Sequence, residues 1–190
     1  MEGSQSLWKQ TGLPWPVDED SRQLWFRPQD DHPGVLIARA RDIPTLVGMG
    51  IADLGIVGLD VLEEYSNTHV LQVADLDFAH CRVVLAGQNE HWPVGPTRIA
   101  TKYQRITQNY FSVHRHPVEI VHLSGSLELA PVIGLAPYIV DIVDTGNTLR
   151  QHHLIEIVTI LKSSARLIAN QSHWRTKPGL EQLRQVLHRV

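Results

Sequence analysis

The strongest constraint on the fold of this chain lies at residues 139–149, which read IVDIVDTGNTL. The segment begins with an apolar run broken only by Asp141, as expected of a buried strand. A small polar turn, DTGNT, follows at residues 144–148, and Leu149 then opens a helix that Thr or Asn would cap. A buried strand that ends in a turn and enters a helix is typical of an α/β fold.

This turn also predicts a binding chemistry. Its backbone N–H groups converge on one point, and the following helix adds partial positive charge there, so the turn can hold a phosphate. Asp141 and Asp144 lie just before it, and carboxylates suit ribose hydroxyls or a Mg²⁺ ion that phosphates also bind. The pattern therefore indicates a site for a phosphorylated ribose.

Two other interpretations of the turn stay open. It is neither a Walker A loop nor a GxGxxG fingerprint, because no lysine follows Gly146 and the second and third glycines are missing. An ordinary strand–turn–helix junction, with Asp and Thr as caps, would use the same residues. Asp144-Thr145-Gly146 would also serve as half of an aspartic protease site, which requires a dimer because the chain holds one copy.

Short apolar runs alternate with helical patterns from Val35 onward, which predicts an α/β fold with a mainly parallel sheet. Strands are expected at residues 22–27, 35–40, 52–58, 70–75, 82–86, 97–100, 118–123, 139–143, 154–162 and 165–168. Helices are expected at residues 43–49, 60–65, 104–113, 127–135 and 178–190, with the end of another at residues 6–12.

The polar, proline-bearing segment at residues 88–96 is a candidate crossover between two lobes. We expect residues 1–87 with 167–190 to form lobe I, and residues 88–166 to form lobe II, which carries the turn. Ligands of open α/β sheets bind outside the carboxyl ends of the strands. We therefore expect a ligand cleft between the lobes, on which these strand ends converge.

Composition excludes several classes of partner. The formal net charge of −3 gives no electrostatic case for binding nucleic acid. The histidines lack the spacing of a metal site, and the single cysteine, Cys81, excludes an internal disulfide. No apolar span of about 18 residues and no export signal are present, which predicts a cytoplasmic protein with no membrane partner.

Several motifs occur in an order that resembles a known enzyme family. They are RARDIP at residues 39–44, ADLGIVG at 52–58, CR at 81–82, ATKY at 100–103, LSGSLELAP at 123–131, the segment at 139–149 and RLIAN at 166–170. Together they resemble the ATP phosphoribosyltransferase of histidine biosynthesis in its short form, the catalytic subunit. The resemblance implies two α/β lobes like those of a type II periplasmic binding protein. It also implies a homodimer within a hetero-oligomer, whose regulatory subunit resembles histidyl-tRNA synthetase.

The family's reaction joins N1 of ATP to C1 of phosphoribosyl pyrophosphate and releases pyrophosphate, with Mg²⁺ as cofactor. The resemblance implies that ATP contacts Tyr103, which would stack on the adenine, Lys102, which would meet a phosphate, and Asp53. The respective alternatives are lobe packing, a solvated charge and a helix cap. No general acid or base is assigned, because pyrophosphate bound to Mg²⁺ leaves easily and positioning and electrostatics suffice. An alternative function is a non-catalytic, two-lobed subunit that binds a phosphorylated metabolite. The residues implied to bind phosphoribosyl pyrophosphate are Asp141, Asp144, Thr145, Gly146, Asn147, Thr148 and Glu128.

The chain departs from the family pattern near its start. The family begins with a strand that ends in Leu-Pro-Lys-Gly-Arg, and no segment of this sequence resembles it. Gln104 also stands where a proline often follows Tyr103, and Asp77 replaces a glycine. We expect a clipped or misassigned start; the alternative is a degraded or partner-completed subunit, which would lack catalysis.

Overall fold

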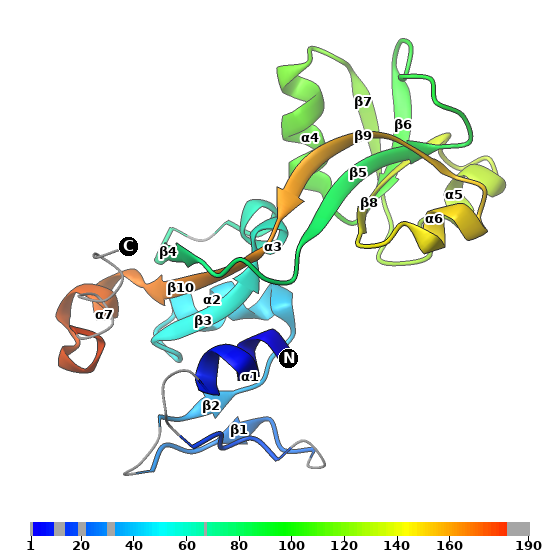
Figure 1. Ribbon diagram of the computed structural model, residues 1–190. Coiled ribbons are helices and arrows are strands. Elements are labelled where there is room, and N and C mark those ends of the chain that lie inside the picture. Colours follow the sequence, from blue (N-terminus) through cyan, green and yellow to red (C-terminus); the bar gives the residue numbers. More distant parts are fainter. Residues whose placement is uncertain (1, 10–13, 19–21, 30–32, 67, 182–190) are drawn as a thin grey trace. The chain divides into compact units, whose positions relative to one another are not determined.

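The computed structural model describes residues 2–9, 14–18, 22–29, 33–66 and 68–181, which form two compact units (Figure 1). Unit 1 comprises Met1–Val61, Tyr65–Ala79 and Ala165–Val190, and unit 2 comprises Leu62–Glu64 and His80–Ser164. We predicted changes of lobe at residues 87 and 167, whereas the long segments change unit after Ala79 and after Ser164. The first boundary moves because the apolar run that ends at Gly87 pairs with strands of unit 2 over its whole length.

Unit 1 contains two small antiparallel sheets. Its elements are α1 (Glu2–Lys9), β1 (Trp25–Phe26), β2 (Val35–Leu36), the 3₁₀ turn η1 (Ala40–Asp42), α2 (Ile43–Gly48), β3 (Leu54–Gly58), β4 (Val70–Asp75), β10 (Ala165–Asn170), α7 (Gln171–Thr176) and the 3₁₀ turn η2 (Pro178–Leu180). Strand β10 lies between β3 and β4, and β1 pairs with β2. Helix α3 (Leu59–Glu64) begins in unit 1 and ends in unit 2.

Unit 2 is built on one five-stranded sheet with the order β7-β6-β8-β5-β9. Strand β8 is the central member of this sheet and leads directly into the predicted phosphate turn. The elements of the unit are β5 (Cys81–Gly87), β6 (Thr97–Thr101), α4 (Gln104–Val113), β7 (Val118–His122), α5 (Leu129–Val132), β8 (Tyr138–Val143), α6 (Asn147–Gln151) and β9 (Ile155–Ser163).

The predicted α/β class is confirmed, but the expectation of a mainly parallel sheet is wrong. Strand β6 runs parallel to β7 and β8, whereas β5 is antiparallel to both β8 and β9. In unit 1, β10 is antiparallel to both of its neighbours. The chain passes from unit 1 to unit 2 through β4 and β5, and it passes back through β9 and β10. Because β4 pairs with β10 and β5 pairs with β9, the paired strands run in opposite directions.

The sheet of unit 2 is buried on both faces near its centre. Val84 and Ala86 of β5 pack with Ile139 of β8 in the cluster that α5 and α6 help to close. The intervening Val83 and Leu85 point to the other face, where they pack with residues of α4. All four of these β5 side chains are fully buried, which explains why β5 reads as a continuous apolar run and not as an alternating one.

Most predicted elements match the structure within one or two residues, including β4 and α4. Helix α5 is shorter than predicted because the chain turns at Gly134, whose φ of +73° lies in the left-handed region. Helix α7 was missed, and most of the predicted helix at 178–190 lies outside the described residues. No helix in the described ranges is both long and apolar enough to cross a membrane.

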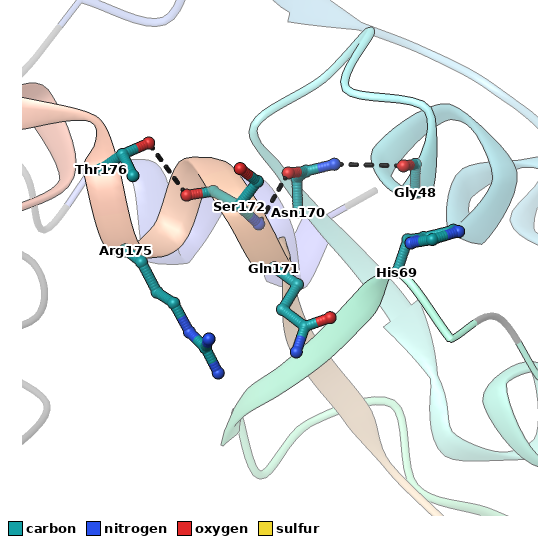
Figure 2. A pocket seen from close by; sticks show the side chains of 7 residues that line it. All are labelled: Gly48, His69, Asn170, Gln171, Ser172, Arg175 and Thr176. Atoms are coloured by element: carbon teal, nitrogen blue, oxygen red, sulfur yellow. Dashed lines mark hydrogen bonds between the residues drawn. The ribbon is translucent and has the colours of Figure 1, made fainter.

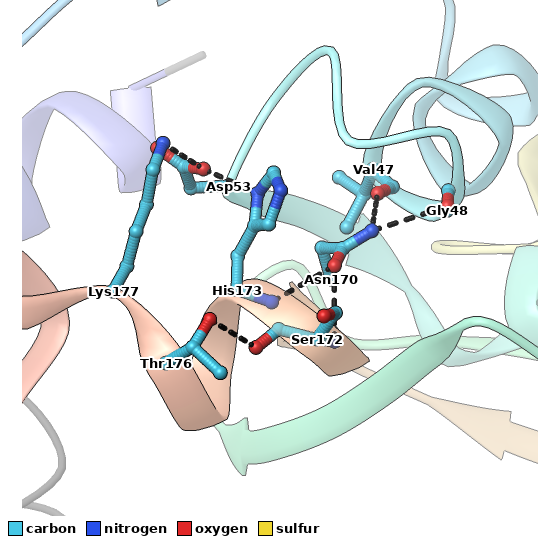
Figure 3. A network of polar contacts seen from close by, with 8 residues as sticks. All are labelled: Val47, Gly48, Asp53, Asn170, Ser172, His173, Thr176 and Lys177. Atoms are coloured by element: carbon cyan, nitrogen blue, oxygen red, sulfur yellow. Dashed lines mark hydrogen bonds and ion pairs between the residues drawn. The ribbon is translucent and has the colours of Figure 1, made fainter.

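One buried amide, that of Asn170, holds the junction between β10, α7 and α2 (Figure 3). Its Oδ1 accepts hydrogen bonds from the N–H groups of Ser172 and His173, each at 3.0 Å, and so caps α7. Its Nδ2 donates to the carbonyl oxygens of Val47 at 2.9 Å and Gly48 at 3.1 Å, at the end of α2. The amide therefore caps the start of α7 and adds donors to two carbonyl oxygens at the end of α2.

We expect Asn170→Ala to lower the free energy of unfolding by about 2–4 kcal/mol, because it removes the N-cap of α7 and the two hydrogen bonds that Nδ2 donates to carbonyl oxygens at the end of α2. Chemical denaturation of the whole protein measures the change. The matched control is Gln171→Ala, at an exposed position in the same helix, which should change stability by less than about 0.5 kcal/mol. Equal losses for the two variants would contradict the role given to Asn170.

Candidate functional site

The predicted turn after β8 is formed by residues 144–146, and α6 begins immediately afterwards at Asn147. Gly146 is the N-cap of α6, with φ +77° and ψ 6°, a left-handed conformation that glycine adopts without strain. Among the described residues no side chain caps α6, so the predicted Thr or Asn cap and the predicted start at Leu149 are wrong. The side chains of Thr145 and Thr148 take no part in capping, and both are exposed.

The turn lines a surface pocket of roughly 160 Å³ in unit 2. Residues 141–149 form most of the lining, and Ile139 and Glu128 complete it. Glu128 comes from the segment just before α5, and only the fold brings it to the turn. Every residue predicted to bind phosphoribosyl pyrophosphate thus lies around this one pocket.

Two arginine side chains hold the carbonyl oxygens of the turn. Arg82 Nη1 donates to the carbonyl oxygen of Asp144 at 3.0 Å, and Arg150 Nη2 donates to that of Thr145 at 2.8 Å. Within the described ranges, no hydrogen bond uses the N–H groups of residues 145–147. The turn therefore has its acceptors satisfied by unit 2 itself and its donors available to a ligand.

Arg82 is itself fixed by the carboxylate of Glu156 on β9. Arg82 Nε donates to both carboxylate oxygens at 3.1 Å, and Nη2 donates to Oε2 at 2.8 Å. Thr159 Oγ1 donates to Oε1 at 3.1 Å. The hydrogen bond to Glu156 raises the pKa of Arg82 above its usual range, and the same bond holds the pKa of Glu156 below its usual range. Both groups are therefore charged at neutral pH.

Two of the predicted site residues, Lys102 and Asp141, form an ion pair. Lys102 Nζ lies 3.1 Å from Asp141 Oδ1, which also accepts a hydrogen bond at 2.8 Å from the N–H of Ile142. The same ammonium group lies 5.1 Å from the centre of the Tyr103 ring. Lys102 was expected to meet a phosphate, and its pairing with Asp141 places a positive charge beside a pocket that is otherwise acidic.

Glu128, the acidic residue opposite the turn, has a histidine nearby. His152 Nε2 lies 3.9 Å from Glu128 Oε1, so the two groups pair when the imidazole is protonated. About a fifth of the Glu128 side chain, 21%, is exposed to solvent. A partly buried carboxylate that still reaches the pocket surface is suited to accept hydrogen bonds from a ligand hydroxyl.

Sequence interpretation missed four residues around the pocket: Arg82, Arg150, His152 and Glu156. From sequence, Arg82 stands only within the motif at residues 81–82, and no role at the site is predicted for His152. A signal for two of them was present, because Arg150 and His152 follow the turn closely in sequence: Arg150 reaches it from α6, and His152, directly after α6, lies near Glu128. Arg82 and Glu156 lie far from the turn in sequence, and only strand pairing brings them to it.

The structure places the predicted adenine contact, Tyr103, in the core of unit 2. Its side chain is only 7% exposed and packs among residues of β5 and α4. Its N–H donates to Thr101 Oγ1 at 2.8 Å, and its carbonyl oxygen accepts from Thr107 Oγ1 at 2.5 Å. Packing, the alternative interpretation, accounts for these contacts, and stacking on adenine stays a prediction.

Asp53, the other predicted nucleotide contact, belongs to unit 1 and is already engaged (Figure 3). Lys177 Nζ lies 2.6 and 2.8 Å from its two carboxylate oxygens, and His173 Nδ1 lies 2.7 Å from Oδ1. Burial raises the pKa of Asp53, but hydrogen bonds from Lys177 and His173 outweigh it and hold that pKa below its usual range. Asp53, just before β3, is thus linked to His173 of α7 and to Lys177 directly after it, which is not the helix cap suggested as the alternative. Contact with a nucleotide stays a prediction.

A larger pocket of roughly 440 Å³ lies in unit 1 at the junction of β10 and α7 (Figure 2). Its lining includes His69, Gln171 and Arg175, but none of the residues predicted to bind a ligand. Asn170, which contributes to it, is committed to the helix cap described above. Because it holds no carboxylate and no exposed turn, we place the candidate site at the pocket of unit 2.

Within the residues described, no group of three or more His, Cys, Asp or Glu side chains is arranged to hold a metal ion. Asp141, Asp144 and Glu128 nevertheless line one pocket and offer oxygen donors. Mg²⁺ is commonly bound through one or two carboxylates together with substrate phosphates. The donor set fits a magnesium ion that arrives with a phosphorylated substrate, and does not fit one held by protein alone.

Comparison with known proteins relates the chain to one family. The family model described as ATP phosphoribosyltransferase matches residues 39–190. An ATP phosphoribosyltransferase from Alkaliphilus metalliredigens is 42% identical over 177 residues, which cover 92% of this chain and 83% of that protein. The corresponding protein of Deinococcus deserti is 41% identical and covers 98% of this chain and 88% of its own length.

Solved structures agree on the fold. A chain of the ATP phosphoribosyl transferase (HisG:HisZ) complex from Thermotoga maritima matches with a TM-score of 0.80 and 32% identity, covering all of this chain and 94% of that one. A periplasmic sulfonate-binding protein, SsuA from Methylobacillus flagellatus, shares the fold with a TM-score of 0.53 and 15% identity over 77% of this chain and 50% of its own. The two-lobed fold of type II binding proteins is thereby confirmed, and the chain belongs to the ATP phosphoribosyltransferase family, the transferases that open histidine biosynthesis.

Proposed function

We propose that the pocket formed by residues 141–148 and Glu128 binds phosphoribosyl pyrophosphate for the ATP phosphoribosyltransferase reaction. One observation carries the proposal. One pocket in unit 2 is lined by the turn, which offers hydrogen-bond donors for a phosphate and carboxylates for a sugar. A further carboxylate, that of Glu128, comes to the same pocket from elsewhere in the sequence. An ordinary helix junction would instead use these side chains as caps, and α6 is capped by a glycine.

The 5-phosphate of the substrate fits the turn itself. The N–H groups of residues 145–147 make no hydrogen bond within the described part of the chain, and successive free N–H groups in a turn form a cradle for an anion. The hydroxyls of Thr145 and Thr148 are exposed beside them and add neutral donors. Helix α6 spans only Asn147–Gln151, so we assign the binding to these groups and not to a helix dipole.

The acidic side chains fit the ribose and its metal. Asp141, Asp144 and Glu128 would accept hydrogen bonds from the ribose hydroxyls, and one or two of them would hold a Mg²⁺ ion that the diphosphate also binds. When bound, the ion neutralises charge on the departing pyrophosphate. Lys102 offsets the charge of Asp141, which lets two further carboxylates share the pocket with less repulsion.

These groups also suit the charge that develops in the reaction. As the bond from C1 to pyrophosphate breaks, positive charge grows on the ribose ring, and carboxylates fixed beside the ring stabilise it. The remaining requirement is that N1 of ATP is held in line with C1, which is a matter of positioning. No residue of the pocket is therefore assigned as a general acid or base.

We further propose that the chain works in the cytoplasm, as a homodimer within a hetero-oligomer that contains a regulatory subunit. The hetero-oligomer is supported by the similarity to a chain from the HisG:HisZ complex of Thermotoga maritima, which is 32% identical and covers the whole of this chain. In such an assembly the chain described above supplies the phosphoribosyl pyrophosphate pocket.

The direct test is release of pyrophosphate from ATP and phosphoribosyl pyrophosphate in the presence of Mg²⁺, measured with and without the regulatory subunit. We expect release that requires both substrates and the protein. Controls omit one substrate at a time, so that simple hydrolysis of phosphoribosyl pyrophosphate is recognised. Saturable binding of phosphoribosyl pyrophosphate without any turnover would support the non-catalytic subunit instead.

Asp144→Ala tests the pocket assignment. We expect the KM for phosphoribosyl pyrophosphate to rise about 10-fold or more, since a hydrogen bond to a charged group contributes about 1.5–3 kcal/mol. The KM for ATP should stay within about twofold. The matched control is Glu90→Ala, which removes one exposed carboxylate of unit 2 outside the pocket and should leave both constants unchanged. Equal losses for the two substrates would reject the pocket assignment.

A further inference from the structure

The turn that lines the pocket is held by a guanidinium group that does not itself line the pocket and that a carboxylate fixes. Arg82 places Nε and Nη2 on the carboxylate of Glu156, at 3.1 and 2.8 Å, and Nη1 on the carbonyl oxygen of Asp144, at 3.0 Å. A guanidinium is planar, so once its fork is seated on the carboxylate the direction of Nη1 is set. Arg82 therefore fixes where the Asp144 carbonyl points.

The direction of that carbonyl determines the direction of a donor. In a trans peptide the C=O of one residue and the N–H of the next point to opposite sides of a rigid plane. With the Asp144 carbonyl turned to Arg82, the N–H of Thr145 is turned the other way. Residues 144–148 line the pocket and Arg82 does not, so the side opposite Arg82 is the pocket side.

Arg150 acts on the next peptide in the same manner, but its hold is weaker. It donates to the carbonyl oxygen of Thr145 at 2.8 Å, which turns the N–H of Gly146 away from it. Arg150 is exposed, and no ion pair fixes its guanidinium in the described part of the chain. Arg82 is anchored through Glu156 to a different strand, so it is the residue that ties the turn to the sheet.

We propose that Arg82 is a positioning residue for phosphoribosyl pyrophosphate: it orients the peptide between Asp144 and Thr145 so that the N–H reaches the 5-phosphate. This role rests on the function proposed above for the pocket. Arg82 does not touch the substrate, and its charge is already paired with Glu156. Its effect is on the geometry of the turn, and it should therefore appear in the binding of one substrate only.

Three variants test the role in the pyrophosphate-release assay with the complete protein. Arg82→Lys keeps the charge but has one nitrogen in place of the fork, so it cannot hold Glu156 and the Asp144 carbonyl together. We expect it to raise the KM for phosphoribosyl pyrophosphate about 10-fold or more, the scale on which small misplacements act, with the KM for ATP unchanged. Glu156→Gln should also raise the KM for phosphoribosyl pyrophosphate. The double variant should have the same KM as Arg82→Lys alone, because Glu156 acts through Arg82.

The control is Arg98→Lys, the same exchange at an exposed position on β6 of the same unit, which should leave both constants unchanged. A KM for phosphoribosyl pyrophosphate that does not change in Arg82→Lys, parallel losses for both substrates, or additive effects in the double variant would each overturn the role. If Arg82→Lys does not fold, Glu156→Gln alone decides by the same split between the two substrates. Asp144→Ala, measured alongside, separates the pocket assignment from the positioning role of Arg82. An unchanged KM for phosphoribosyl pyrophosphate in Asp144→Ala rejects the pocket assignment. A raised KM in Asp144→Ala with an unchanged KM in Arg82→Lys rejects only the positioning role.

Discussion

The burial of β8 in the centre of a five-stranded sheet is the constraint on which the rest of unit 2 depends. Ile139 and Val140 are almost fully buried, on opposite faces of the sheet, so a shift of β8 by one residue would move each side chain into the cluster packed for the other. The turn at its end is therefore held at one place relative to β5 and to the segment that carries Glu128. The position of the binding groups in the turn is thus set by the buried strand that precedes them.

Acidic and basic groups occupy different places in the site. Three carboxylates line the pocket, and the basic groups lie beside or behind them: Lys102 on Asp141, Arg82 on the Asp144 carbonyl and Arg150 on the Thr145 carbonyl. The arginines are occupied by protein acceptors. This leaves N–H and hydroxyl donors for a phosphate and carboxylates for a sugar with its metal, which is the division of labour a phosphorylated ribose requires.

The sequence predicted most elements within one or two residues and named residues that the fold brings to one pocket, but it predicted the partners of each of these residues poorly. Strands such as β5 and β8 were recognisable because buried runs carry a local signal. Glu128 was assigned to the pocket only through the family resemblance, since no local pattern joins it to the turn. The burial of Tyr103 and the pairing of Asp53 with Lys177 could not be predicted in the same way, because both are properties of the folded chain. Strand direction was mispredicted for the same reason: an apolar run is compatible with either orientation of its neighbours.

The central claim is that the turn after β8 binds the 5-phosphate of phosphoribosyl pyrophosphate. A crystal structure of the protein with phosphoribosyl pyrophosphate and Mg²⁺ tests it most directly. The account predicts the 5-phosphate within hydrogen-bond distance of the N–H groups of residues 145–147, with the ribose hydroxyls towards Asp141, Asp144 or Glu128. A 5-phosphate bound anywhere else, for instance in the pocket that includes Arg175, would contradict it.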